Sequence, residues 1–250
     1  MGLGFSAEES RRYYRNILLP EVGEEGQQRF RSGKVLVVGA GGIGSAALLY
    51  LAAAGVGHIG IVDADVVELS NLQRQILHQV GDVGRQKVKS AREAIMALNP
   101  HCRLEIYDLR LQMANVQAIL PGHDAVLDGS DNFATRFLVA DYCWRGKIPL
   151  VSAAATGFQG LLLVVDQQQG SPCYRCLLPQ PPATWSEEGI LGAVAGVMGC
   201  LQALEALKLI LGRNSEMARS FLAFDALRCR FTTMARVKSP DCPVCGNKEP

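Results

Sequence analysis

The stretch KVLVVGAGGIGSAALLYLAAAGVGHIGIVD, residues 34–63, decides how we expect this chain to fold. Its beginning, 34–39, is an apolar run that predicts a buried strand. Residues 42–55 have the apolar pattern of a helix, which Gly55 would end. Residues 58–63 predict a second strand. A strand, a helix and a strand in close succession indicate a right-handed unit with two parallel strands.

The rest of the chain extends this unit in two ways. Up to about residue 156, apolar runs alternate with helical periods, which predicts further parallel strands with helices between them. Beyond that point GFQGLLLVVD predicts an antiparallel strand. The additional strands are expected at 103–108, 124–129, 149–154, 157–166, 220–226 and 229–236, and the additional helices at 85–98, 112–120 and 132–145.

The fold class that follows is α/β, with a Rossmann-like, mostly parallel sheet that is continued by antiparallel strands. A chain of 250 residues can form one large domain or two small ones. We expect a single domain over 1–250, with a nucleotide-binding part at about 30–156 and an antiparallel, cysteine-bearing part at about 157–250. The one clearly irregular segment is PQPPATWSEEG, residues 179–189, which we interpret as a loop.

The composition is that of an ordinary soluble globular protein, with 48% hydrophobic and 20% charged residues. The formal net charge of +1 gives no reason to expect a nucleic-acid or anionic-membrane partner. No secretory signal precedes the first helix, where Ser6 and Glu9 predict a capping box, although Gly2 and Ser6 also match the loose myristoylation pattern. The longest apolar run, Gly189–Gly212, meets Glu205 before it could span a bilayer, so we expect a buried helix and a cytoplasmic protein.

The glycine-rich turn is the first motif with chemical meaning. It has the form GxGxxG, follows a predicted strand and opens a helix, so its backbone N–H groups could bind a phosphate. Asp63 ends the next strand, where a carboxylate can accept hydrogen bonds from ribose hydroxyls. These features alone would favour an NAD-dependent oxidoreductase. The glycines of the turn are Gly39, Gly41, Gly42 and Gly44.

The polar run after Asp63 favours a different nucleotide. Arg74 and Lys87 offer cations suited to a phosphate chain, which a ribose carboxylate alone would not require. A solvated loop and helix face is the competing interpretation. Asp131 follows another strand, where a carboxylate faces the ligand crevice and could hold magnesium with the substrate phosphates, or could merely cap the helix that begins at Asn132. The remaining polar candidates in the run are Asp65, Asn71 and Gln75.

Two CxxC pairs form the second strong signal. Cys173 with Cys176 and Cys242 with Cys245 match a four-thiolate zinc site, although 65 residues separate the pairs. A redox CxxC would not explain the second pair, and a reducing compartment disfavours disulfides. We therefore favour structural zinc. The other four cysteines, Cys102, Cys143, Cys200 and Cys229, are expected in the core.

Taken together, these segments resemble the MoeB/ThiF enzymes, bacterial relatives of the adenylation domains of ubiquitin-activating enzymes. The matching segments occur in the family's order over nearly the whole chain. They are RYYRNILL, VVGAGGIGS, DADVVELSNLQRQIL, VGRQKVKSA, ALNP, LDGSDN, PCYRC, AGVMGCLQALEALK and CPVC.

The resemblance implies ATP-dependent adenylation of the C-terminal Gly-Gly carboxylate of a small ubiquitin-like sulfur carrier, with release of pyrophosphate. It also implies a homodimer, in which Arg15 reaches the neighbouring subunit's site. By the same resemblance the glycine loop, Asp63 and the phosphate-binding side chains would hold ATP, Asp131 would hold magnesium, and the four paired cysteines would bind zinc. The phosphate-binding side chains would be Asn71, Arg74, Gln75 and Lys87.

One position departs from the family's pattern. Some relatives carry a cysteine in the loop before the long apolar helix that links covalently to the carrier, and Trp185 stands there in this chain. We therefore expect no covalent carrier intermediate at this loop and a separate protein as sulfur donor. Other interpretations stay open: activation of a peptide or tRNA carboxylate, an NAD-binding oxidoreductase, or a catalytically silent nucleotide-binding scaffold.

Overall fold

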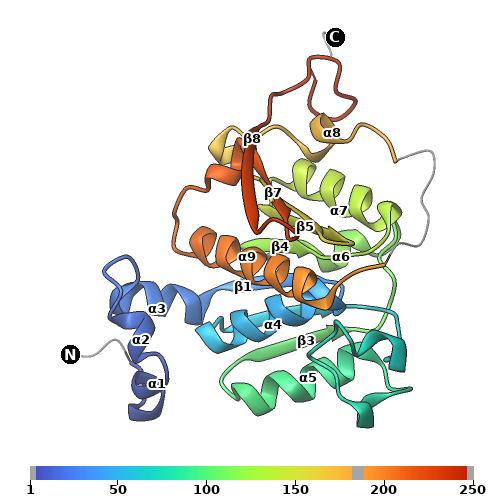
Figure 1. Ribbon diagram of the computed structural model, residues 1–250. Coiled ribbons are helices and arrows are strands. Elements are labelled where there is room, and N and C mark those ends of the chain that lie inside the picture. Colours follow the sequence, from blue (N-terminus) through green and yellow to red (C-terminus); the bar gives the residue numbers. More distant parts are fainter. Residues whose placement is uncertain (1–3, 182–188, 247–250) are drawn as a thin grey trace.

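The computed structural model describes residues 4–181 and 189–246, which build one eight-stranded sheet (Figure 1). The strand order is β3-β2-β1-β4-β5-β6-β7-β8. The first five of these strands run parallel, and the pairs from β5 to β8 are antiparallel. The strands are β1 (Lys34–Val38), β2 (His58–Val62), β3 (Arg103–Tyr107), β4 (Ala125–Asp128), β5 (Leu150–Thr156), β6 (Gln159–Val165), β7 (Ser220–Asp225) and β8 (Arg230–Ala235).

Helices cover both faces of the parallel part of the sheet (Figure 1). One core cluster joins α4, α5 and α9 to one face, and a second joins α6 and α7 to the other. The α-helices are α1 (Ala7–Arg12), α2 (Tyr14–Ile17), α3 (Gly23–Ser32), α4 (Gly42–Ala54), α5 (Lys87–Leu98), α6 (Val116–Ile119), α7 (Phe133–Gly146), α8 (Tyr174–Leu177) and α9 (Gly192–Ile210). The mostly parallel α/β sheet with antiparallel strands at one end confirms the fold class.

Helices α4 and α9 pack against each other more closely than ordinary side chains would allow. A Cβ atom added to Gly199 of α9 would lie 2.2 Å from the backbone oxygen of Ile43 in α4. The same substitution at Gly192 would bring a Cβ within 2.3 Å of the backbone oxygen of Gln73. The small residues of α9 thus set the distance from this helix to the start of α4 and to the segment that contains Gln73 and Arg74.

The apolar helix α9 is a core helix by its packing. By length and apolar composition alone, α9 is the one helix in the described part of the chain that could cross a membrane. It lies along α4 and the strands β4 to β6, with Val194, Met198 and Ala206 among its buried residues. Glu205 within it is also buried, and accepts hydrogen bonds from Lys208 and Ser215.

Local details differ from expectation at two places. The helix expected over 112–120 is the single turn α6, because the Asn115 side chain accepts from the Gln112 N–H and donates to the Arg110 carbonyl, which forms a turn before the helix. Cys229 is not a core residue: it is exposed in the β7–β8 turn with φ of 48°. The capping box of Ser6 and Glu9 is present as expected.

Candidate functional site

The glycine loop joins β1 to α4 through a turn that two of its glycines make possible. Gly39 has a φ of 93°, in the left-handed region that favours glycine. A Cβ atom on Gly44 would lie 1.8 Å from the backbone oxygen of Gly39, so no side chain fits there. The turn leaves the N-terminal N–H groups of α4 facing the carboxyl end of the sheet. This geometry suits the binding of a phosphate or another anion.

Asp63 ties the end of β2 to the glycine loop. Its two carboxylate oxygens accept hydrogen bonds from the backbone N–H of Ala40 and of Asp65, each at 2.8 Å. Burial raises the pKa of Asp63, while the nearby Lys87 ammonium and the two N–H groups oppose that shift. Each oxygen keeps a lone pair for a further donor, so the carboxylate can still accept from ribose hydroxyls.

Lys87 begins α5 and is a buried cation with a single ion-pair partner among the described residues. Its side chain is 7% exposed, and its Nζ lies 2.9 Å from a carboxylate oxygen of Asp65, whose side chain is 52% exposed. The backbone N–H of Lys87 also donates to the Asp65 carbonyl. The ammonium is thus held at the edge of the site, where a phosphate group could share it.

Arg74 and Gln75 flank the glycine loop from the segment after Asn71. The aliphatic Cγ of Arg74 lies 3.4 Å from the position of a Cβ on Gly42, and its guanidinium donates to the Ser70 carbonyl at 3.2 Å. Gln75 is 4% exposed, and its side-chain oxygen has no hydrogen-bond partner among the described residues. A buried acceptor without a donor is costly, and a bound ligand with hydroxyl or amine groups would satisfy it.

Asn71 stabilises the turn that leads into this segment. Its side-chain oxygen accepts a hydrogen bond from the backbone N–H of Glu68 at 3.2 Å, and its amide nitrogen lies 3.5 Å from the Ser70 hydroxyl. The residue is buried. In this structure Asn71 therefore positions the turn, and its backbone carbonyl accepts a hydrogen bond from the Arg74 N–H at 3.0 Å.

The strand β4 delivers the second acidic candidate to the same edge of the sheet. Asn132, not Asp131, caps α7: its side-chain oxygen accepts from the Thr135 N–H at 2.9 Å. This result removes the interpretation of Asp131 as a helix cap. The Asp131 carboxylate is exposed and has one partner in the described residues, the Asn132 amide at 3.3 Å, so its oxygens are available to a cation.

Two buried side chains that sequence reasoning missed hold the loops of the site. His78 donates from Nε2 to the Ala40 carbonyl at 3.0 Å and, at Nδ1, accepts from the Ser90 hydroxyl at 2.8 Å. Burial lowers the pKa of His78, which favours this neutral form. Arg136 of α7 donates to the carbonyls of Ser130 and Ala153 and lies beside the buried Asp128. Neither residue belongs to a periodic or spaced motif that would have marked it.

Arg15 is the candidate that the fold does not bring to this site. Its neighbour Asn16 donates to the carbonyl of Ala54, which ends α4, whereas the glycine loop precedes the start of that helix. A helix of 13 residues is about 20 Å long, so Arg15 and the loop lie at opposite ends of α4. The Arg15 side chain is exposed and has no ion-pair partner in the described part of the chain.

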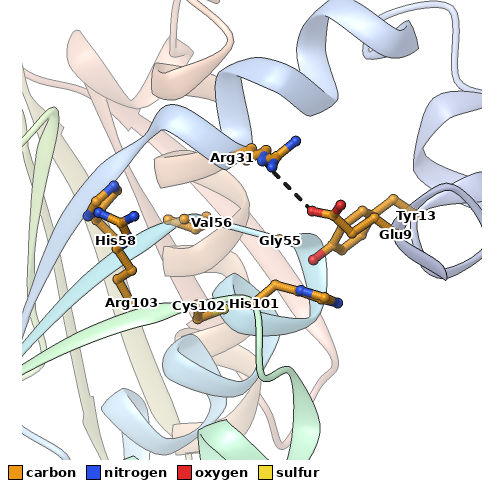
Figure 2. Close-up of a pocket in the computed structure, with 10 residues that line it drawn as sticks. Glu9, Tyr13, Arg31, Gly55, Val56, His58, His101, Cys102 and Arg103 are labelled. Carbon is orange, nitrogen blue, oxygen red and sulfur yellow. Dashed lines mark ion pairs between the residues drawn. The ribbon is translucent and has the colours of Figure 1, made fainter. Parts of the chain in front are cut away.

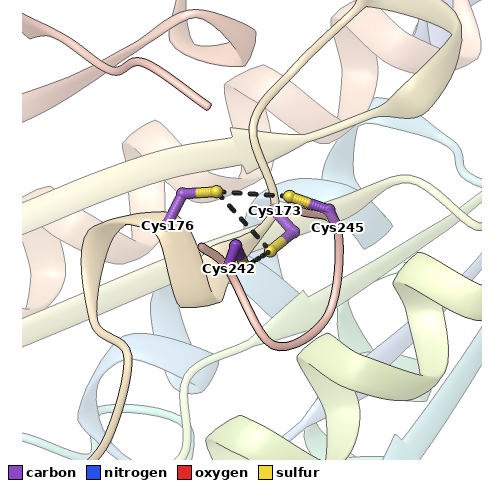
Figure 3. Close-up of side chains that lie close together, drawn as sticks. All are labelled: Cys173, Cys176, Cys242 and Cys245. Carbon is purple, nitrogen blue, oxygen red and sulfur yellow. Dashed lines mark hydrogen bonds between the residues drawn. The ribbon is translucent and has the colours of Figure 1, made fainter. Parts of the chain in front are cut away.

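The two CxxC pairs come together as the sequence predicts (Figure 3). All four sulfur atoms lie within 4.8 Å of one another. The Cys173 and Cys242 sulfurs are 3.4 Å apart, and the Cys176 and Cys245 sulfurs are 3.2 Å apart. Four thiolates at a metal–sulfur distance of about 2.3 Å would lie roughly 3.8 Å from one another, so the cluster has the dimensions of a tetrahedral metal site.

The protein also supplies hydrogen bonds that favour thiolates in this cluster. Burial opposes ionisation of Cys242, but the backbone N–H groups of Val244 and Cys245 and the neighbouring thiols lower its pKa to about 7. The backbone N–H of Ser239 donates to the Cys176 sulfur at 3.4 Å. Burial and the adjacent thiols raise the pKa of Cys173, which is the expected cost of crowding several sulfurs without a cation.

Comparison with known proteins identifies relatives over nearly the whole chain. The model of the ThiF family matches residues 13–244. The chain is 45% identical over 253 residues to a SAMP-activating enzyme E1 of Haloferax volcanii, covering 98% of this chain and 92% of that protein. It is 44% identical to a sulfur carrier protein adenylyltransferase of Thermus thermophilus, with 98% and 93% covered.

Longer relatives match over part of their length. An adenylyltransferase and sulfurtransferase MOCS3-1 of Zea mays is 47% identical over 241 residues, which are 94% of this chain and 51% of that protein. The chain thus spans about half the length of such relatives. Among solved structures, E. coli MccB with ATP has a TM-score of 0.84 at 23% identity, covering 94% of this chain and 75% of that one, a likeness of fold.

Proposed function

This chain belongs to the ThiF family, and from that premise we propose that it is an adenylyltransferase for a ubiquitin-like sulfur-carrier protein. It would use ATP to activate the carrier's C-terminal Gly-Gly carboxylate. A carboxylate oxygen forms a bond to the α-phosphorus of ATP, and the bond from that phosphorus to the bridging oxygen breaks. The products are the acyl-adenylate and pyrophosphate, which leaves with the bonding electron pair.

One observation carries this proposal beyond the likeness to named adenylyltransferases. The carboxyl ends of β1, β2 and β4 bring a glycine loop, a ribose-type carboxylate and an available carboxylate to one edge of the sheet, beside Arg74, Gln75 and Lys87. Adenylation needs a cation-rich, preorganised surface for phosphate charge more than it needs a protein nucleophile. An oxidoreductase would have no common use for these cations and for Asp131.

The proposed roles follow from the positions of the side chains. The loop of Gly39, Gly41, Gly42 and Gly44 approaches the nucleotide with its backbone, and Asp63 accepts from the ribose. Lys87 and Arg74 stabilise the charge that develops on the α-phosphate oxygens and on the departing pyrophosphate. Asp65 positions Lys87, and Asn71 and Gln75 complete the polar wall.

Two metals accompany these roles. Asp131, with Asn132 beside it, fits magnesium because its carboxylate is exposed and weakly engaged. Magnesium would neutralise phosphate charge there. The four cysteines fit a structural zinc ion. Their sulfur atoms lie close together, and the N–H of Ser239 donates to one of them, which favours thiolates.

The assembly belongs to the proposal as well. We place Arg15 in the active site of a second copy in a homodimer, which accounts for its exposure and its distance from this chain's own loop. The sulfur donor would be a separate protein, and the compartment would be the cytoplasm.

Trp185, which replaces the loop cysteine of some relatives, lies outside the described residues. Cys200, on α9, has a raised pKa because of burial, so it is a poor nucleophile.

The experiment that tests this function is magnesium-dependent ATP–pyrophosphate exchange, with and without candidate carriers that end in Gly-Gly. We expect exchange with one carrier, and none when its terminal glycine is removed. Binding of ATP without exchange for any carrier would contradict the proposal and favour a scaffold or a different carboxylate substrate. Preferential binding of a nicotinamide nucleotide would favour the oxidoreductase.

A further inference from the structure

Three basic side chains stand side by side at the amino ends of the parallel strands. Lys34 begins β1, His58 begins β2 and Arg103 begins β3, and the strand register pairs Lys34 with His58 and His58 with Arg103. Neighbouring strands are about 4.8 Å apart, and residues in register point to the same face. We call these three residues the cationic row.

The cationic row has no carboxylate partner. In the described part of the chain, no hydrogen bond or ion pair engages the side chain of any of its three members. Like charges directly opposite each other on adjacent strands are destabilising, so Lys34 and Arg103 on the two sides of His58 disfavour its protonation. Burial lowers the pKa of His58, and the Arg103 and Lys34 charges lower it further.

Three acids near the row have other partners than its side chains. Asp124 accepts the backbone N–H of Lys34 at 2.8 Å. Glu105 lies on the same face as Arg103, and burial together with Glu105 raises the pKa of Tyr107 to about 12. Glu9 accepts the Ser6 N–H and lies 3.7 Å from the Arg31 guanidinium. These carboxylates lie close to the row, but in the described part of the chain none of them pairs with the side chain of Lys34, His58 or Arg103.

Two cavities open onto the row and share His58 and Arg103. One, of about 330 Å³, lies between these residues and the first helices, where Figure 2 shows the Arg103 side chain extending toward the His58 ring. The other, of about 440 Å³, includes Lys34 and His123 in its wall. Both volumes lie within the range of small-molecule sites.

We propose that Lys34, His58 and Arg103 form a binding site for a small anion that carries phosphate or carboxylate groups. The site is distinct from the proposed nucleotide site, because the strands of five residues separate the two edges of the sheet by roughly 16 Å. A bound anion would relieve the repulsion within the row and would restore the proton to His58. A polymer such as nucleic acid is disfavoured, since the cations form one short row in a chain with net charge +1.

The test uses histidine NMR, because the chain contains four histidines and His58→Gln assigns the signal of interest. Sulfate is the first probe, since it stays divalent throughout the range in which a histidine side chain titrates. The titratable and charged groups that line the two cavities with His58 are, in the larger one, Lys34, Arg103, Glu105, Tyr107 and His123, and, in the smaller one, Glu9, Tyr13, Arg31, His101 and Cys102. We expect sulfate to raise the His58 pKa by about one unit, equivalent to roughly tenfold tighter binding to the protonated form.

The decisive comparison is between two charge-matched double variants. Lys34→Gln with Arg103→Gln should weaken sulfate binding at least about tenfold. Lys238→Gln with Arg230→Gln removes the same charge from exposed positions around β8 and should leave binding unchanged. If the first pair prevents folding, Arg103→Gln alone provides the comparison. Phosphate and a dicarboxylate then compete against sulfate to identify which group the site prefers.

The proposal is overturned if the His58 signal does not respond to any of these anions, or if both double variants respond as the unaltered protein does. Carrier-dependent pyrophosphate exchange should persist in the Lys34→Gln, Arg103→Gln variant. Loss of exchange with anion binding retained would count against the proposed separation of the two sites. The anion test does not depend on the proposed adenylation, because its readout is the titration of His58.

Discussion

At the scale of single residues, Arg74 and Asp131 are the side chains whose removal should affect the proposed reaction most directly. Each would act on phosphate charge, Arg74 as a donor and Asp131 through a cation. Losing one preorganised group of this kind typically costs about 2.7–4 kcal/mol, or roughly 10²–10³ in rate. We therefore expect Arg74→Ala and Asp131→Ala each to reduce carrier-dependent pyrophosphate exchange by about that factor.

The control for both variants is Glu24→Ala, an exposed carboxylate on α3 that should leave exchange unchanged. Circular dichroism and urea unfolding should show that all three proteins fold. Near-normal turnover in Arg74→Ala or Asp131→Ala would exclude that residue from the mechanism.

Residue types and spacing predicted much of this site because the chemistry is carried by short motifs. The glycine loop, Asp63 and the four paired cysteines are examples, and the structure brings the cysteines together. The roles of His78 and Arg136 were beyond sequence reasoning, since each acts by burial against carbonyls distant in the chain. The sequence permits either Asp131 or Asn132 to cap α7, and it is the fold around β4 that gives the role to Asn132.

At the scale of elements, the packing of α4 against α9 can be tested with two glycines of one helix. Gly199→Ala would place a Cβ 2.2 Å from the Ile43 carbonyl oxygen, so α9 must move away from α4. Overpacking of this kind costs typically 1–3 kcal/mol, and we expect the free energy of unfolding to fall by about 2 kcal/mol. Because Ile43 lies in the glycine loop, we also expect a higher Kd for ATP.

Gly196→Ala is the matched control in the same helix. A Cβ at Gly196 meets nothing within 4 Å, and replacing a helical glycine by alanine stabilises by roughly 0.5–1 kcal/mol. The free energy of unfolding measured in urea should therefore fall for Gly199→Ala and rise for Gly196→Ala. Equal effects would show that the helix–helix distance is not set at Gly199.

Elements were predicted well where periodicity is strong and less well where side chains compete with the backbone. The strands of the sheet appear close to their expected bounds, including β7 and β8 after a change from parallel to antiparallel pairing. The helix expected at 112–120 was too long, because Asn115 forms a local turn. Apolar content alone could not reveal that turn.

At the scale of the whole molecule, the cysteine cluster ties the end of the chain to the segment after β6. We expect one zinc ion per chain and a Tm that falls by about 5 °C or more on chelation, since about 2–4 °C corresponds to 1 kcal/mol at this size. Cys242→Ser should lose the metal. Cys229→Ser, at an exposed cysteine outside the cluster, should retain the metal and the Tm.

The metal-free protein should also show a pH dependence of defined sign. The folded state lowers the pKa of Cys242 to about 7 from an ordinary value of 9.0. The thiolate therefore contributes stability above pH 9.0 that is lost as the pH falls through about 7. Buried thiols with raised pKa values, such as Cys102 and Cys173, act in the opposite direction, so the test compares two chelated proteins. In urea unfolding, the stability difference between the unaltered chain and Cys242→Ser should shrink as the pH falls from 9.0 through about 7.

The proposed homodimer gives the last prediction, because it requires Arg15 to act in the partner's site. Arg15→Ala and Asp131→Ala should each be nearly inactive alone. A heterodimer of the two variants contains one site with both residues intact, since Arg15 comes from one chain and Asp131 from the other. After random mixing, half the dimers are heterodimers with one working site in two, so activity should recover to roughly one quarter of the unaltered level. If Arg15 acted within its own chain, no heterodimer site would contain both residues and no activity would return.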